Sequence, residues 1–317
     1  MSTPSTGPGA SPVPGPDGRR GDRSGAVLGE RRHLLNLSYR LLGSLAEAED
    51  AVQETYARWY AMTPARREAV DSPGAWLTTV AGRVCLDVLG SARVRRERYV
   101  GTWLPEPLPD RAEWPGGGAG AADPADRITL DESVGMAFLV VLESMTPAER
   151  VAFVLHDVFR YPFPEIAAIV ARTPAACRRL ASSGRRRIRA ATLPAGGNTL
   201  VVRDFKEAWE AKDIEALVAL LDPEATMVAD GGGLVGAVLR PVEGAEAIAR
   251  YLLFIAGKAP DTTLLLRTVN GAPGLVAQRD GGTVTVASLD VAGGRVTRVL
   301  AVRNPEKLGS WTAPRSG

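Results

Sequence analysis

The spacing of apolar residues changes once along this 317-residue chain, and the change separates two kinds of fold. Up to residue 190, apolar residues recur every three or four positions, as they do in helices with one buried face. Between residues 262 and 304 they alternate in four short runs separated by glycine-containing turns, a pattern typical of antiparallel strands. The chain is therefore predicted to be multidomain, with all-α domains followed by an α+β domain.

Composition and capping signals divide the chain. Ser44 with Glu47 and Thr146 with Glu149 each have the capping-box pattern that predicts the start of a helix. Residues 1–25 are rich in proline, glycine and serine, with little to bury, and are predicted to be disordered. Further helices are predicted over residues 199–221 and 242–256, ahead of the strands. The predicted parts are a first helical domain at 26–99 with a loop at 62–71, a linker at 100–127, a second helical domain at 128–193 and an α+β domain at 198–317.

Residues 163–190 have the pattern of a helix-turn-helix. Thr173 is a good N-cap and Pro174 suits the first position of the second helix. That helix carries six arginines and no acid, and its apolar residues lie on the opposite face. Such a helix enters the major groove of DNA in many regulators. Because glycine lowers helix stability, we expect the turns after Gly184 to bend or fray.

An arginine-rich helix can also be a solvated surface, so the charge of the whole chain matters. Lys and Arg outnumber Asp and Glu by eleven to nine in residues 26–100 and by nine to four in residues 141–190. Residues 101–140 are acidic, with two basic residues against seven acids. A polyanion such as DNA is therefore expected to meet the two helical domains and not the linker.

Other features exclude several classes of protein. Cys85 and Cys177 lie on apolar stripes without neighbouring ligands, so they are predicted to be buried side chains, not a metal site or a disulfide. There is no apolar run of eighteen residues and no signal pattern at the N-terminus, which predicts a cytoplasmic protein without membrane contact. We expect no cofactor.

Three stretches carry a resemblance to a known family: LSYRLLGSLAEAEDAVQETYARW, SPGAWLTTVAGRVCLDVLGSAR and MTPAERVAFVLHDVFRYPFPEIAAIVARTPAACRRLAS. They resemble the two helical domains of bacterial extracytoplasmic-function (ECF) sigma factors. The rest of the chain resembles a SnoaL-like domain, a cone-shaped α+β fold shared with cystatins and ketosteroid isomerases. The motifs WLPEP, ADGGG and VRNPEKL are similar to those of a sigma-factor subgroup with this domain fused at its C-terminus.

The resemblance implies an alternative sigma factor that binds core RNA polymerase and directs promoter-specific initiation of transcription. The β′ clamp helices and the β subunit would be its contacts on polymerase, and the expected β′-binding face consists of Asp50, Gln53 and Glu54. The first helical domain would bind the minus-ten element of the promoter and the second the minus-thirty-five element. The candidate DNA contacts are Arg83, Arg93, Arg95, Arg96, Thr173, Arg178, Arg179, Ser182, Arg185 and Arg186.

A regulatory contact between the linker and the C-terminal domain is predicted from the same motifs. A tryptophan flanked by prolines is too apolar for a simple spacer, so this part of the linker is expected to dock. Docking would set the placement of the two DNA-binding domains. The expected contact residues are Trp103, Leu104, Pro105, Glu106, Pro107, Asp230, Gly231, Gly232, Gly233, Asn304, Pro305, Glu306, Lys307 and Leu308.

Two other functions remain open from the sequence. One is a helix-turn-helix regulator whose C-terminal domain senses a small molecule, which would not need the acidic face at Asp50. The other is an enzyme with a nucleic-acid-binding extension. We expect no catalysis, because both histidines lie in the helical part and Asp230, which precedes three glycines, suits a turn. An unidentified small ligand in the cone is compatible with each function.

Overall fold

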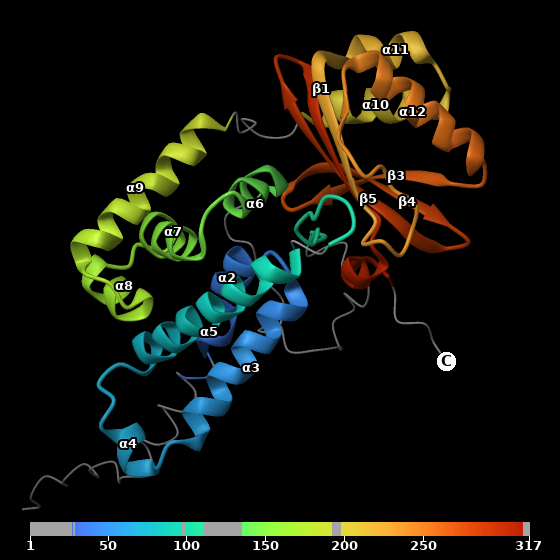
Figure 1. Cartoon of the computed structure of the whole chain (residues 1–317). Helices are drawn as coiled ribbons and strands as arrows, with labels where there is room; N and C mark the ends of the chain where they lie inside the picture. The colour runs from blue at the N-terminus through green and yellow to red at the C-terminus, as the bar shows by residue number, and fades with distance from the viewer. Residues whose placement is uncertain (1–26, 28, 97–98, 111–134, 192–197, 313–317) are drawn as a thin grey trace, which may run out of the picture.

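The computed structural model describes residues 27, 29–96, 99–110, 135–191 and 198–312, with the backbone alone for residues 93–96. The predicted N-terminal tail lies outside the described residues. So do the linker after residue 110 and the start of the helix expected from residue 128. Figure 1 shows a helical half and a half that carries the sheet, with a short stretch of linker between them.

The first helical domain consists of helices, as predicted. Gly43 ends the first of them in the left-handed conformation, with φ of 71°, which glycine adopts without strain. Ser44 then caps the next helix. The segment predicted as a plain loop contains a short helix instead, because the Thr63 hydroxyl accepts a hydrogen bond from the N–H of Arg66. The helices are α2 Arg31–Leu42, α3 Leu45–Ala61, α4 Pro64–Glu68 and α5 Pro73–Arg96.

The second helical domain confirms the helix-turn-helix. Thr146 and Glu149 form the predicted capping box at the start of α7. Ala171 ends α8 in the left-handed conformation, and Thr173 caps α9 two residues later. The described elements are α6 Met136–Glu143, α7 Pro147–Phe153, the π-helical turn η3 Val154–Val158, α8 Phe163–Val170 and α9 Pro174–Ala190.

The expected bend at Gly184 is wrong, since α9 continues as one helix to Ala190. Gly184 is buried against α7, where an added Cβ would lie 2.8 Å from the Cβ of Phe153. A glycine here lets the two helices approach closely, and the packing outweighs the propensity cost of about 1 kcal/mol. Cys177 and Ala181 are buried on the same side of α9, and Cys85 is buried in the first domain, as predicted.

The C-terminal domain differs from the prediction in three places. The helix expected over residues 242–256 runs from Ala245 to Lys258, because Val242 and Glu243 pair as a short strand. The expected helix over residues 199–221 is two helices, because the chain turns at Lys212, whose φ is 56°. Leu221 begins a strand that was not predicted. The elements are α10 Thr199–Glu210, α11 Ile214–Leu220, β1 Leu221–Asp230, β2 Val242–Glu243, α12 Ala245–Lys258, β3 Thr263–Val269, β4 Ala272–Arg279, β5 Gly282–Ala292, β6 Arg295–Val302 and two 3-10 turns, η4 Pro305–Lys307 and η5 Gly309–Trp311.

These strands form one sheet in the order β2-β1-β6-β5-β4-β3. The predicted antiparallel meander is confirmed for β3 to β6. β1 pairs in parallel with β6, so the ends of these two strands lie side by side at Asp230 and Val302. The residues that follow both strands are thereby brought together, although more than 70 residues separate them in the sequence.

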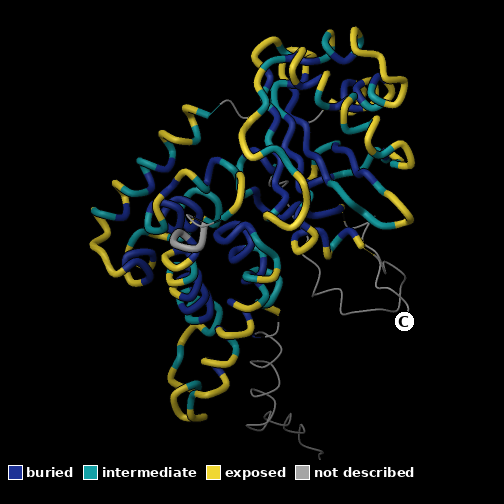
Figure 2. The backbone as a smooth tube through the Cα atoms, turned by 45° about the vertical axis from the view of Figure 1, so that its right-hand side comes forward, coloured by how far each residue is buried: buried dark blue, intermediate teal, exposed yellow. Residues whose placement is uncertain are grey.

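Alternate residues of the strands contribute to two different cores. Met227, Ala229 and Ala301 belong to a core that they share with α10, α11 and α12. Val228, Leu300 and Val302 belong to the core formed by the linker and the helical domains. Figure 2 shows the strands as largely buried, with exposed residues gathered on the outer helices and turns. The sheet therefore separates the inside of the cone from the docked linker.

Candidate promoter, polymerase and linker interfaces

The basic face of α9 is partly free and partly paired within the protein. Arg178, Arg179 and Arg186 are exposed. The guanidinium carbon of Arg178 lies 5.4 Å from the centre of the Phe163 ring, a cation–π contact that orients it. Arg185 instead makes an ion pair with Asp157, with 2.7 Å between Nε and Oδ1, and it also approaches the hydroxyl of Ser182. Exposed cations therefore lie along the whole of α9, and Arg185 is the one of these four arginines that is partly buried and paired.

Arg83 lies at the boundary between the two helical domains. Its guanidinium donates a 2.9 Å hydrogen bond to the carbonyl oxygen of Ala168 in α8. The adjacent Gly82 faces Ile169, whose side chain would lie 2.9 Å from a Cβ at position 82. Arg93, Arg95 and Arg96 end α5, but their side chains lie outside the described residues.

A buried arginine joins the same two domains. Arg150 of α7 donates to the carbonyl oxygen of Leu41 in α2 at 2.9 Å, to Glu143 at 2.7 Å and to the carbonyl oxygen of Leu142 at 2.9 Å. Burial lowers the pKa of this guanidinium to about 9. A second polar contact joins the domains at Tyr161, whose hydroxyl lies 3.0 Å from both a ring nitrogen of His33 and the hydroxyl of Thr78. The helical domains therefore pack together through specific polar contacts.

The expected polymerase-binding face lies along α3. Asp50, Gln53 and Glu54 are all exposed there. Glu54 pairs with Arg58 one turn later, at 2.8 Å between exposed groups, a contact of little energetic weight. Trp59 is buried behind this face, with its ring centre 5.1 Å from that of Trp76. The three polar residues form an accessible acidic surface on a rigid helix.

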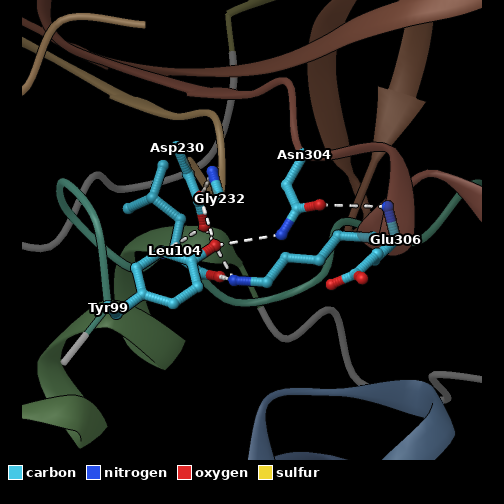
Figure 3. Close-up of polar contacts among 7 residues, drawn as sticks. Tyr99, Leu104, Asp230, Gly232, Asn304 and Glu306 are labelled. Atoms are coloured by element: carbon cyan, nitrogen blue, oxygen red, sulfur yellow. Dashed lines mark hydrogen bonds and ion pairs between the residues drawn. The ribbon is translucent and has the colours of Figure 1, made fainter. Parts of the chain in front are cut away.

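The carboxylate of Asp230 is the centre of the contact between linker and C-terminal domain (Figure 3). One oxygen accepts hydrogen bonds from the Tyr99 hydroxyl at 2.6 Å and the Gly232 N–H at 3.0 Å. The other accepts from the Leu104 N–H at 2.8 Å and the Lys307 ammonium at 2.7 Å. Asp230 is fully buried, so these four donors replace the water that its charge loses.

Lys307 completes this arrangement, which we call the linker clamp: Tyr99, Trp103, Leu104, Asp230 and Lys307. The ammonium of Lys307 also donates to the carbonyl oxygen of Leu104 at 2.6 Å. It lies 4.0 Å from the centre of the Trp103 ring and 5.2 Å from that of Tyr99. A cation between two aromatic rings, paired with a buried carboxylate, fixes both position and direction of the linker.

Two predicted residues support the clamp from outside it. The amide of Asn304 donates to the Tyr99 hydroxyl at 3.0 Å, and its oxygen accepts from the Glu306 N–H at 3.0 Å. Gly232 has φ of 64°, and a Cβ there would lie 2.5 Å from the Asn304 amide nitrogen, so a larger residue would displace it. Pro305 and Glu306 are exposed and Leu308 is buried, while Gly233 faces Val100 of the linker.

The second half of the docked linker contacts the first helical domain as well, which the prediction did not include. The carboxylate of Glu106 accepts from the Leu45 N–H at the start of α3, at 2.7 Å. The Tyr39 hydroxyl donates to the Glu106 carbonyl oxygen at 2.7 Å. Pro105 lies beside Gly43. The linker is thus held between the sheet and the first helical domain.

Several contact residues were missed by sequence reasoning. Asn270, in the turn after β3, accepts from the Leu108 N–H at 2.9 Å and donates to Tyr39 at 2.9 Å. The Trp311 indole donates to the Pro107 carbonyl oxygen at 2.8 Å. The sequence carries no local signal for the contacts of Asn270 and Trp311, since they depend on a tertiary approach. Tyr99 was also missed, although it lies only four residues before Trp103.

Glu106 is expected to make linker docking depend on pH. Burial raises the pKa of its carboxyl to about 7, opposed by the Leu45 N–H and Lys307 and assisted by Glu49. The docked form therefore binds this proton more tightly than the released form. The stability that the proton gives to the docked form is lost as pH rises from the ordinary carboxyl pKa through 7. We expect the urea concentration at the unfolding midpoint of the full chain to decrease as the pH is raised from about 5.5 to about 8.

The matched variant is Glu106→Gln, which keeps an oxygen to accept from Leu45 but does not titrate. Its urea midpoint should change less with pH than that of the unmodified protein. Parallel curves for the two proteins would show that Glu106 does not couple docking to pH.

Comparison with known proteins agrees with this geometry. Residues 27–98 match the family model for sigma-70 region 2, and residues 135–188 match that for sigma-70 region 4. The chain is 36% identical over 294 residues to the ECF RNA polymerase sigma factor SigJ of Mycobacterium tuberculosis, covering 88% of this chain and 90% of that protein. The chain belongs to the ECF RNA polymerase sigma factors.

Other ECF sigma factors support the same assignment. The probable ECF RNA polymerase sigma factor SigI of M. tuberculosis is 34% identical over 301 residues, covering 93% of this chain and 97% of that protein. The crystal structure of M. tuberculosis SigJ aligns with a TM-score of 0.70 at 34% identity, over 92% of this chain and 99% of that one. The predicted combination of two helical domains with a C-terminal SnoaL-like domain is confirmed.

As an ECF sigma factor, the chain acts with core RNA polymerase and promoter DNA to initiate transcription at specific promoters. Sigma factors are not enzymes, so membership of this family argues against the third function considered from the sequence. The helix-turn-helix regulator that acts without polymerase is excluded by the match to region 2. In the described part of the chain, no helix is both long and apolar enough to cross a membrane.

Proposed function

We propose that this ECF sigma factor is held in a closed form by its C-terminal domain, and that release of the linker clamp lets it engage a promoter. The centres of the minus-ten and minus-thirty-five elements are about 25 base pairs apart, or roughly 85 Å at 3.4 Å per base pair. The helical domains instead contact each other, with Arg150 2.9 Å from the Leu41 carbonyl oxygen. They must separate to occupy both elements at once.

The observation that carries this proposal is the position of Arg83. A cation expected to contact DNA donates instead to the backbone of the second helical domain at Ala168. The linker that connects the two domains is bound by Asp230 and Lys307. A docked linker limits how far the domains move apart, which is the physical basis for inhibition by the clamp.

We also propose roles for the individual interfaces. Arg178 and Arg179 read or approach the minus-thirty-five element, with Ser182 and Arg186 beside them and Thr173 fixing the start of the helix. Arg83, Arg93, Arg95 and Arg96 contact the minus-ten region after opening. The acidic face at Asp50, Gln53 and Glu54 binds the β′ clamp helices, and the β subunit supplies the second polymerase contact. Arg185 would have to break its ion pair with Asp157 before it could contact a phosphate.

The test of the closed form is run-off transcription with core RNA polymerase and the full-length chain. Trp103→Ala removes the ring over Lys307 and the contact beside Gly43. We expect it to raise transcription several-fold and to increase the distance between labels on α5 and α9. Leu200→Ala, in an exposed residue of α10 outside the cone cavity, is the matched control. Unchanged transcription and unchanged distance in Trp103→Ala would reject the closed form.

Arg178→Ala is expected to reduce core-dependent transcription about fivefold or more, because one contact to a base is worth about 1–3 kcal/mol. The readout is run-off transcription on a promoter that the unmodified protein recognises. Arg203→Ala, an exposed arginine of α10 paired with Asp204, should have no effect. Equal output from both variants would remove Arg178 from the promoter interface.

A further inference from the structure

The cone of the C-terminal domain contains an open cavity of about 620 Å³, which is the size that small-molecule sites have. Its inner wall is apolar and is built from the same face of the sheet as the domain core. Phe205, Met227, Leu275, Leu289 and Val299 line it, and each of them is buried. Exposed residues of α12, Phe254 among them, lie at its rim.

The charged residues around this cavity are mainly cationic. The described lining residues include four cations and one acid. The cations are Lys212, Lys258, Arg279 and Arg303, and the acid is Glu210. That acid is paired with Lys206 at 2.7 Å. An apolar chamber with a cationic border favours an apolar molecule that carries an anionic group, because the charge is paired while the rest is buried.

Arg303 connects the cavity to the linker clamp. Its guanidinium donates to the carbonyl oxygen of Gly236, and both residues line the cavity. Its backbone N–H donates to the carbonyl oxygen of Asp230 at 2.7 Å, next to a 2.9 Å bond from Asn304. A guanidinium has five N–H donors in a planar fork, which suits a carboxylate better than a single carbonyl oxygen.

The sheet provides a second connection between the cavity and the linker clamp. Ala229 and Ala301 are paired across β1 and β6 and both line the cavity. The next residue of β1 is Asp230, whose side chain lies on the opposite face and binds the linker. Gly236 and Ala237 line the cavity and belong to the loop that follows Asp230. A molecule in the cone would therefore contact the same two strand ends that carry the clamp.

We propose that the cone binds an apolar organic molecule with one carboxylate, which pairs with Arg303 and thereby loosens the linker clamp. The carboxylate takes the guanidinium from the Gly236 carbonyl, so that the loop after Asp230 loses its hydrogen bond to the Arg303 side chain. Nothing is cleaved or transferred, so the cone acts as a sensor. This regulation rests on the closed form proposed above, while binding itself does not.

Calorimetry on the full-length chain tests the ligand class with three probes of equal chain length: decanoate, decanol and decyltrimethylammonium. Decanoate is expected to bind at least tenfold more tightly than the other two. Arg303→Gln should remove that preference for the anion. Arg250→Gln, an exposed arginine of α12 paired with Glu246 outside the cavity lining, should keep it. Equal binding of the three probes, or no binding, would overturn the proposal.

Hydrogen exchange at the Leu104 amide tests the coupling, since this N–H donates to the buried Asp230. Saturating decanoate should speed its exchange at least tenfold in the unmodified chain, with no effect in Arg303→Gln. Bound decanoate with unchanged exchange would refute the coupling. Failure of decanoate to bind, while Trp103→Ala still raises transcription, would reject the sensor and leave the closed form standing.

Discussion

Asp230→Ala is expected to speed hydrogen exchange at the Leu104 amide by about 10²-fold to a few thousand-fold. The substitution removes the acceptor of that N–H and leaves the Lys307 ammonium buried without its carboxylate. Removing one partner of a buried ion pair costs about 3–5 kcal/mol, and 1.4 kcal/mol corresponds to a factor of ten. Because Lys307 also donates to the Leu104 carbonyl oxygen, the linker itself should lose its position.

The matched control is Asp204→Ala, which breaks an exposed pair with Arg203 in α10. It should leave exchange at Leu104 unchanged, because exposed ion pairs contribute about 0–1 kcal/mol. The double variant Asp230→Leu with Lys307→Met should lose less protection than Asp230→Ala, since it leaves no buried charge without a partner. Full protection at Leu104 in Asp230→Ala would show that the linker is held by its apolar contacts alone.

Arg150→Ala is expected to reduce the free energy of unfolding of the helical half by about 3–5 kcal/mol. The side chain is 3% exposed, and its loss would leave the Leu41 carbonyl oxygen and the Glu143 carboxylate without this donor. The effect should appear as faster hydrogen exchange in both α2 and α7, because the lost contact joins them. Urea unfolding followed by circular dichroism gives the size of the change.

Arg187→Ala is the control for this second effect. Arg187 is 43% exposed and lies 3.6 Å from Glu149, so its removal should cost less than about 1 kcal/mol. If Arg150→Ala were as stable as Arg187→Ala, the two helical domains would not depend on this arginine for their packing. Arg150→Ala should also raise core-dependent transcription, provided that the domains still fold, because it favours their separation.

The local signals of the chain were sufficient for most of its helices and strands. Thr146, Thr173 and Ser44 predicted helix starts because a side-chain oxygen at the N-cap satisfies an N–H within the next turn. The alternation in residues 262–304 predicted β3 to β6 in the right order. β1 was missed because its central residues, Glu224 to Thr226, lack the strong alternation of the other strands.

The candidate interfaces could be predicted from the sequence to different degrees. The motifs around Trp103, Asp230 and Lys307 predicted a contact between these segments, since a docked tryptophan needs a partner surface. Their hydrogen bonds could not be predicted. Asp230 reaches the linker because β1 and β6 pair in parallel and end together, and that pairing joins segments far apart in the chain.

The sequence by itself determined the helical domains, the α+β domain and the basic face of α9, because caps and apolar spacing act within a few residues. Tertiary structure alone decided that Gly184 packs without bending its helix, that Arg83 and Arg150 join the helical domains, and that Glu106 contacts α3. These contacts need surfaces that exist only after the domains have formed. Their energies come from burial and from partners that no local pattern specifies.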